Sequence, residues 1–200
     1  MVLGSETAGP RGVFAYLRLG IEHILLEPDH ALFVLGLVLL VKDCWLLLKT
    51  ILAFTVANTV TLSVAAIGVI RVPGPPLNAA IALSILFIGL EIVRSWKGQS
   101  SFTIRHPWVM AFGFGLLHGF GYATGLSLLG LPRGELLLAL LLFNAGIEIG
   151  QDIVVLLVLA LRRSFRQLEI PWPLWVWRLP GTVVGTAGVY WTLQTTTALL

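Results

Sequence analysis

Charged residues and cysteines are scarce in this chain of 200 residues. Only 12% of its residues are charged, against about 25% in an average soluble domain, while 57% are hydrophobic. A soluble fold of this size has too little interior to bury so many apolar side chains. The composition therefore excludes a large soluble catalytic domain, a nucleic-acid-binding module and a disordered chain. The single cysteine, Cys44, cannot form an internal disulfide, and the N-terminus lacks the basic segment of a secretory signal peptide.

Long apolar stretches instead predict an all-α integral membrane protein, with residues 1–200 forming a single polytopic membrane domain. A spanning helix needs about 20 apolar residues, and polar, Gly-rich or Pro-rich breaks divide the chain into six such stretches. We predict a bundle of about six transmembrane helices at residues 12–41, 46–70, 77–96, 107–129, 135–161 and 179–199. The stretch 171–179 is predicted to be a loop that carries interfacial tryptophan anchors.

Basic residues are concentrated between alternate spans. Nine of the 13 Lys and Arg residues fall in the stretches 42–49, 94–105 and 162–178. Because basic loops stay on the cytoplasmic side of a membrane, we predict a multi-pass protein of the cytoplasmic (inner) membrane with both termini outside. Topology then accounts for the basic residues, so the expected partner is the lipid bilayer and not a nucleic acid.

Acidic residues and histidines show the opposite distribution. Six of the ten Asp and Glu residues and three of the four histidines fall inside the predicted spans. Each charge in hydrocarbon costs about 2.5–3.5 kcal/mol, which favours an interior site for these groups. Carboxylates and imidazoles with few cations nearby indicate a positively charged ligand. Without thiolates, they suit divalent Ni, Co, Zn or Mn better than Cu(I).

The first span carries the densest group of ligand-type residues. His23, Asp29 and His30 follow the pattern H-x5-D-H around Pro28. On an unbroken helix the two histidines would lie about 10.5 Å apart along the axis, too far to share an ion. Pro28 should break the helix and begin a second half-helix with Asp29 in its first turn. The alternative is an interfacial helix over residues 12–27 that precedes the true span.

Two later spans contribute further candidates. His118 lies in the Gly-rich stretch 113–125, and Glu148 belongs to a polar stripe in the fifth span. We predict that both bind the metal, supported from farther out by Asn58, Asn144, Gln151 and Asp152. The alternative for His118 is a hydrogen-bonded packing residue, and for the stripe a set of interhelical hydrogen bonds. Glu91 could be a gate, a partner for Arg94 or an interfacial residue.

Four segments, 20–33, 54–62, 115–123 and 143–151, resemble the signature segments of the HupE/UreJ family. These small hydrogenase or urease accessory membrane proteins are regarded as nickel or cobalt permeases. The resemblance implies that the metal-handling residues are His23, Asp29, His30, His118 and Glu148. The second segment of the family usually reads Phe-Thr-x-Ala-His, whereas this chain has Asn58 at the last position. That departure implies a weaker site or a different metal preference.

The expected function is transport of a nickel- or cobalt-type divalent ion, with no permanently bound cofactor and no enzymatic activity. The chain lacks the H-E-x-x-H and G-x-S-x-G motifs of metalloproteases and serine hydrolases. Two alternatives remain open: a membrane-embedded metal-dependent enzyme, and an accessory protein that binds metal without moving it.

Two features of the later spans bear on symmetry and assembly. Spans one and four are both interrupted near a histidine, and spans two and five both carry Phe followed by a polar face. This is compatible with an inverted repeat of three plus three spans. Gly181, Gly185 and Gly188 in the last span could mediate either a homo-oligomer or packing within the chain.

Overall fold

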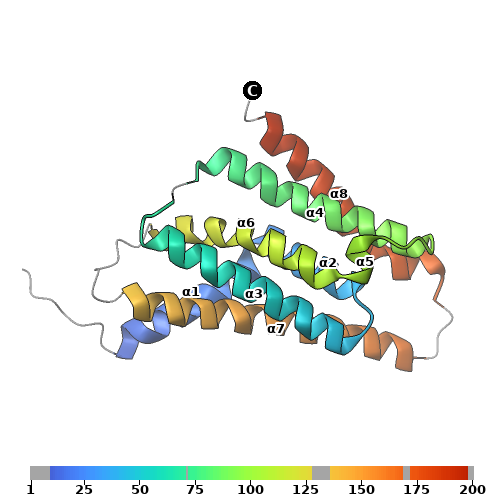
Figure 1. The fold of residues 1–200 in the computed structure, drawn as a ribbon. Helices are drawn as coiled ribbons and strands as arrows, with labels where there is room; N and C mark the ends of the chain where they lie inside the picture. The colour runs from blue at the N-terminus through green and yellow to red at the C-terminus, as the bar shows by residue number, and fades with distance from the viewer. Residues whose placement is uncertain (1–9, 71, 128–135, 169–171, 198–200) are drawn as a thin grey trace, which may run out of the picture.

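The computed structural model describes residues 10–70, 72–127, 136–168 and 172–197, and these residues form helices and no strands (Figure 1). The predicted all-α fold is thereby confirmed. In chain order the helices are α1 (Pro10–Leu26), α2 (Pro28–Leu40), α3 (Cys44–Ala66), α4 (Gly74–Trp96), α5 (Phe102–Arg105), α6 (Pro107–Ser127), α7 (Leu136–Gln167) and α8 (Leu174–Thr197).

Several helices meet the requirements for crossing a membrane. Within the described residues, α3, α4 and α7 are each long and apolar enough, and α1 with α2 qualifies as one span bent by 72°. Three or four candidate spans make the chain a multi-pass membrane protein. The larger number of about six spans stays a prediction.

Some helix bounds differ from those predicted. α8 begins at Leu174, so most of the stretch expected to be a loop is the start of this helix, and Pro180 lies inside it. α7 continues beyond residue 161 to Gln167. The short helix α5 was not predicted, and it begins where the Ser101 side chain accepts a hydrogen bond from the amide of Ile104. Residues 128–129, 131–135, 171 and 198–199 of the predicted elements lie outside the described residues.

Glycines allow three helix pairs to pack closely: α1 with α7, α3 with α6, and α4 with α8. A Cβ at Gly89 of α4 would lie only 2.6 Å from the Gly185 Cα of α8. Added carbons at Gly181 and Gly188 would likewise meet side-chain or backbone atoms of α4. The glycine face of the last helix therefore packs within the chain, as one of the two alternatives predicted. A homo-oligomer stays a prediction.

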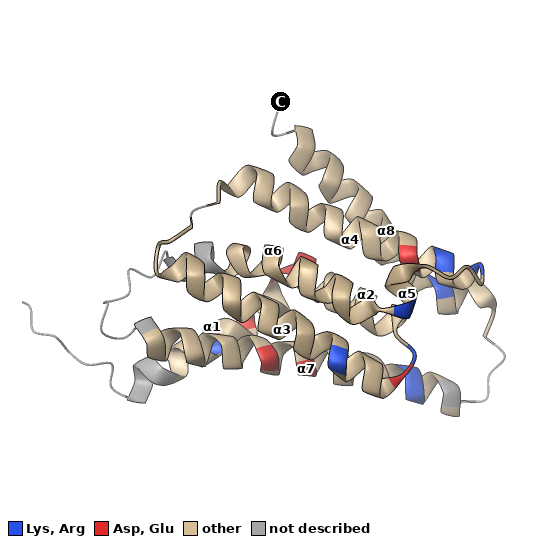
Figure 2. Ribbon diagram, in the orientation of Figure 1, with Lys and Arg blue, Asp and Glu red and all other residues tan. Residues whose placement is uncertain are grey.

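Charge is distributed unevenly along the bundle. Figure 2 shows most of the described Lys and Arg residues at one end, around α5 and the end of α7. Carboxylates instead occur along the length of the helices. This end of the bundle is thus basic, whereas acidic residues are spread over the helices.

Candidate metal centre

The first predicted span is broken at the predicted position. Glu27 is extended, with φ −91° and ψ 105°, and Pro28 occupies the first turn of α2 together with Asp29. Proline is favoured there because the first amides of a helix have no partner within the helix. The 72° bend between the two half-helices brings the rings of His23 and His30 to a centroid distance of 4.9 Å.

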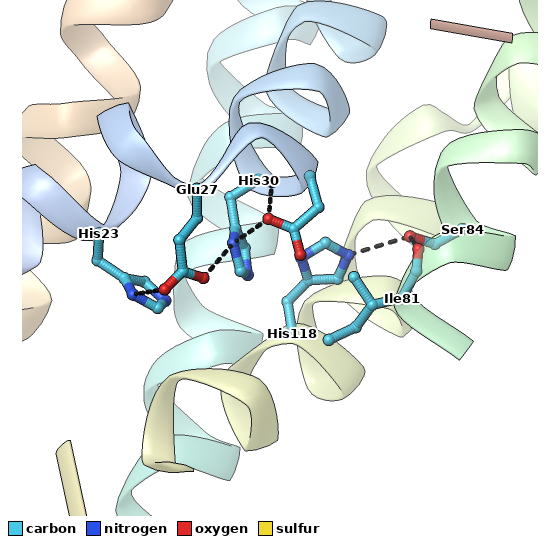
Figure 3. Close-up of polar contacts among 7 residues, drawn as sticks. His23, Glu27, His30, Ile81, Ser84 and His118 are labelled. Atoms are coloured by element: carbon cyan, nitrogen blue, oxygen red, sulfur yellow. Dashed lines mark hydrogen bonds and ion pairs between the residues drawn. The ribbon is translucent and has the colours of Figure 1, made fainter. Parts of the chain in front are cut away.

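A group of three side chains at this bend could hold a metal ion. One ligand atom each from His23, Glu27 and His30 lies within 4.8 Å of the others. His23 Nδ1 lies 2.9 Å from Glu27 Oε1, and His30 Nδ1 lies 3.3 Å from Glu27 Oε2 (Figure 3). Ligand atoms around one tetrahedral transition-metal ion lie about 3.3–3.6 Å apart. The Glu27 oxygens already lie within that spacing of His23 and His30, and the two imidazoles would have to move closer together to share one ion.

Glu27 was not among the predicted metal-handling residues. The sequence contains a signal for it, because it stands four positions after His23 and three before His30. Both spacings put side chains on one face of a regular helix. Once the chain is expected to break at Pro28, however, helix periodicity no longer determines where Glu27 points. Asp29, which was predicted, lies beside the group, with Oδ1 3.0 Å from His30 Nδ1.

His118 of α6 joins the site from another helix. Its ring centroid lies 5.1 Å from that of His30, and both side chains are buried. His118 Nε2 lies 3.0 Å from Ser84 Oγ on α4, and the Ser84 hydroxyl donates to the Ile81 carbonyl at 2.6 Å (Figure 3). A hydroxyl has one proton, so Ser84 accepts from His118 Nε2–H. Neutral His118 consequently carries a lone pair on Nδ1.

Four imidazole nitrogens of the site are buried without a hydrogen bond: His23 Nε2, His30 Nδ1, His30 Nε2 and His118 Nδ1. Of these, His30 Nδ1 has carboxylate oxygens at 3.0 and 3.3 Å. Buried polar atoms are rarely left unpaired. The Tyr122 ring packs beside two of these imidazoles, with centroids 4.9 Å from His23 and 4.7 Å from His30. Its buried hydroxyl lies beside the Asn58 amide of α3. Such a donor set, dominated by imidazole and carboxylate, suits a divalent transition metal.

Glu148 lies in a different polar group, between α3 and α7. It stands one turn from both Asn144 and Gln151, which contact Thr59 and Thr55 of α3. Thr55 also lies beside the Glu148 carboxylate. The metal-binding group found among the described residues does not include Glu148.

The remaining predicted residues occupy two different environments. Asn58 is fully buried on α3, and its amide lies beside the Tyr122 hydroxyl. Asp152 of α7 is exposed. The supporting role of both residues in metal binding stays a prediction.

Comparison with known families gives one match. A family model described as HupE / UreJ protein matches residues 3–195, nearly the whole chain. No curated protein and no solved structure matches the chain significantly.

Proposed function

This chain belongs to the HupE/UreJ family, and we propose that it transports a divalent transition-metal ion of the nickel or cobalt type across the cytoplasmic membrane. The observation that carries the proposal is the group of His23, Glu27 and His30 at the bend between α1 and α2. The ion is the cargo of the protein, held transiently by imidazole and carboxylate ligands.

Access to the site changes from one ligand to the next. The Glu27 side chain is 48% exposed, that of His23 is 11% exposed, and that of His30 is 3% exposed. His118, next to His30, is completely buried. A hydrated cation would therefore meet Glu27 first and exchange water for imidazole nitrogens as it moves inward. Glu27 and Asp29 would also supply the negative charge that offsets the ion in a low-dielectric environment.

The arrangement of the helices supports an inverted repeat of three plus three spans. In such a repeat the broken helix α1–α2 corresponds to α6, α3 corresponds to α7, and α4 corresponds to α8. This correspondence maps the close pair α3–α6 onto the close pair α7–α1, and it maps the third close pair, α4–α8, onto itself. A Cβ at Gly115 of α6 would meet the Phe54 carbonyl of α3, and one at Gly20 of α1 would meet the Phe143 carbonyl of α7. In many transporters such repeats rock against each other around a broken-helix site.

The proposed orientation places the basic end of the bundle in the cytoplasm and both termini outside, following the distribution of Lys and Arg (Figure 2). Metal would then enter from outside and leave toward the basic end.

The proposal is tested by uptake of radioactive nickel, cobalt and zinc into proteoliposomes that contain the purified protein. We expect saturable uptake that prefers nickel or cobalt. His30→Gln and His118→Gln should each reduce the initial rate at least about tenfold, since even contacts that only orient a ligand contribute 10- to 100-fold. The control is His106→Gln, because His106 is exposed and its ring contacts that of Phe102 at a tilted angle. Equal, non-saturable uptake of all three metals would contradict the proposal.

The same liposomes distinguish transport from the alternatives of catalysis and of binding without flux. A transported ion should exchange within seconds to minutes and be removed by mild chelation. An ion retained stoichiometrically through purification, without uptake, would favour a metal-dependent enzyme or an accessory protein instead.

A further inference from the structure

A second polar group lies between α3 and α7 and contains only oxygen and amide atoms. We call it the α3–α7 oxygen cluster, and its members are Thr55, Thr59, Asn144, Glu148 and Gln151. It has no imidazole and no sulfur, so its chemistry differs from that of the metal centre.

The contacts in the cluster leave several oxygen atoms available. Thr55 Oγ1 lies 3.2 Å from Gln151 Oε1, and Thr59 Oγ1 lies 3.2 Å from Asn144 Oδ1. Both distances exceed the usual 2.7–2.8 Å of a hydroxyl hydrogen bond. The Thr59 hydroxyl is also 2.9 Å from the carbonyl of Thr55 in its own helix, a better acceptor for its single proton. These hydrogen bonds leave lone pairs on the hydroxyl and amide oxygens of the cluster without a donor.

One carboxylate oxygen of the cluster, Glu148 Oε2, is buried without a hydrogen bond, and the Thr55 side chain lies beside this carboxylate. Gln151 is completely buried; its Oε1 faces Thr55 and is the atom that could bind a cation, whereas its unpaired Nε2 is a donor. If the cluster only joined α3 to α7 by hydrogen bonds, the carboxylate would remain buried with an unsatisfied oxygen. Such an atom costs about 1–3 kcal/mol, and more when it is charged. A bound cation would satisfy this oxygen.

The charge of the cluster determines which cation fits. Glu148 is its only ionisable member, and the ion pairs among the described residues do not include Glu148. The next carboxylate along α7, Asp152, lies one turn away and is exposed, so it is not part of the cluster. One carboxylate with neutral oxygens balances a single positive charge, whereas a divalent ion would leave excess charge within the membrane. Hard cations prefer oxygen ligands over nitrogen or sulfur. Asn144 and Glu148 are partly buried.

We infer that the α3–α7 oxygen cluster binds a sodium ion, through Glu148 and the oxygens of Thr55, Thr59, Asn144 and Gln151. This site is separate from the imidazole centre. Binding of sodium does not depend on the proposed function, whereas any coupling between sodium and metal movement rests on it.

The test measures equilibrium binding of radioactive sodium to the purified full-length protein, with choline chloride keeping the ionic strength constant. The unmodified protein should bind sodium saturably at one site per chain. Glu148→Gln and Thr55→Val should each weaken binding by about tenfold or more, since a lost contact of about 1.4 kcal/mol changes affinity tenfold. Thr55→Val preserves the shape of the side chain and removes only its hydroxyl. It keeps the test decisive if the Glu148 variant does not fold.

The matched control is Thr186→Val, because Thr186 is exposed on α8 and its hydroxyl contacts only its own helix backbone at 2.9 Å. This variant should bind sodium as the unmodified protein does. Nickel binding by Thr55→Val, measured in parallel, should stay within about twofold because the imidazole centre is intact. The inference is overturned if the unmodified protein shows no saturable sodium binding, or if either Thr55→Val or Glu148→Gln folds and binds sodium normally. If only nickel uptake failed, the proposed function would be contradicted, whereas the inferred sodium site would not.

Discussion

Ser84 fixes the tautomer of His118, because it accepts a hydrogen bond from Nε2 at 3.0 Å and donates its own proton to Ile81. The nitrogen that remains, Nδ1, is then ready to bind a metal. Orientation of a ligating histidine by an outer partner contributes 10- to 100-fold to metal affinity in other sites.

Replacing Ser84 by alanine should therefore weaken nickel binding about tenfold. Isothermal titration of the purified protein in detergent measures this change. Ser100→Ala is the control, because Ser100 is exposed in the loop after α4. An unchanged affinity in Ser84→Ala would mean that His118 does not bind the metal through this tautomer.

Pro28 separates α1 from α2, and Pro28→Ala should restore an amide that can continue the helix. We expect the bend to open and nickel affinity to fall about tenfold or more, since His23 and His30 would move toward the 10.5 Å axial spacing of a straight helix. Spin labels on Cys44 and on a cysteine at Phe14, both exposed, report the bend by pulsed electron paramagnetic resonance.

The label separation should lengthen in Pro28→Ala and stay the same in Pro75→Ala, because Pro75 is exposed in the first turn of α4. If the separation does not change, tertiary packing and not the proline maintains the bend.

Gly119 allows α6 to approach α3. A Cβ there would meet the Thr61 hydroxyl and lie 2.5 Å from the Asn58 carbonyl. Gly119→Ala should lower the free energy of unfolding by about 1–3 kcal/mol, the usual cost of overpacking. Gly113 on the same helix has nothing within 4 Å of an added Cβ, so Gly113→Ala should be neutral or slightly stabilising. Unfolding in mixed detergent micelles compares the two, and equal effects would contradict the predicted packing.

Glu91 is buried at the end of α4, where it accepts hydrogen bonds from Arg94, at 2.6 Å, and from Ser101. Arg94 is 54% exposed. Arg94→Gln should cost about 3 kcal/mol of stability because it leaves a buried carboxylate unpaired. Glu91→Gln should cost only about 1 kcal/mol, since the released arginine can reach water. Thermal unfolding measures the stability of both variants. A larger loss of stability in Glu91→Gln than in Arg94→Gln would contradict this prediction.

Sequence periodicity and composition were enough to predict the helical membrane fold and the break at Pro28. They were also enough to select His23, Asp29, His30 and His118, which lie together in the structure. Imidazoles in apolar stretches are costly, so their positions are informative without a structure. The position of Glu27 beside these histidines was missed because its direction depends on the bend angle. The contacts of Glu148 depend on how α7 packs against α3, which no local pattern contains, and its role in metal binding stays a prediction.

The two halves of the broken helix, α1 and α2, pack mainly against different helices. α1 packs mainly on α7, whereas α2 packs more extensively on α4 than on any other helix. In the proposed transport cycle His23 would follow the helix pair α1–α7 and His30 the pair α2–α4, while the Glu27 carboxylate contacts both histidines. A rotation between these two helix pairs would separate the two imidazoles and break up the set of ligands around the ion. The movement that opens the site would then also release the ion.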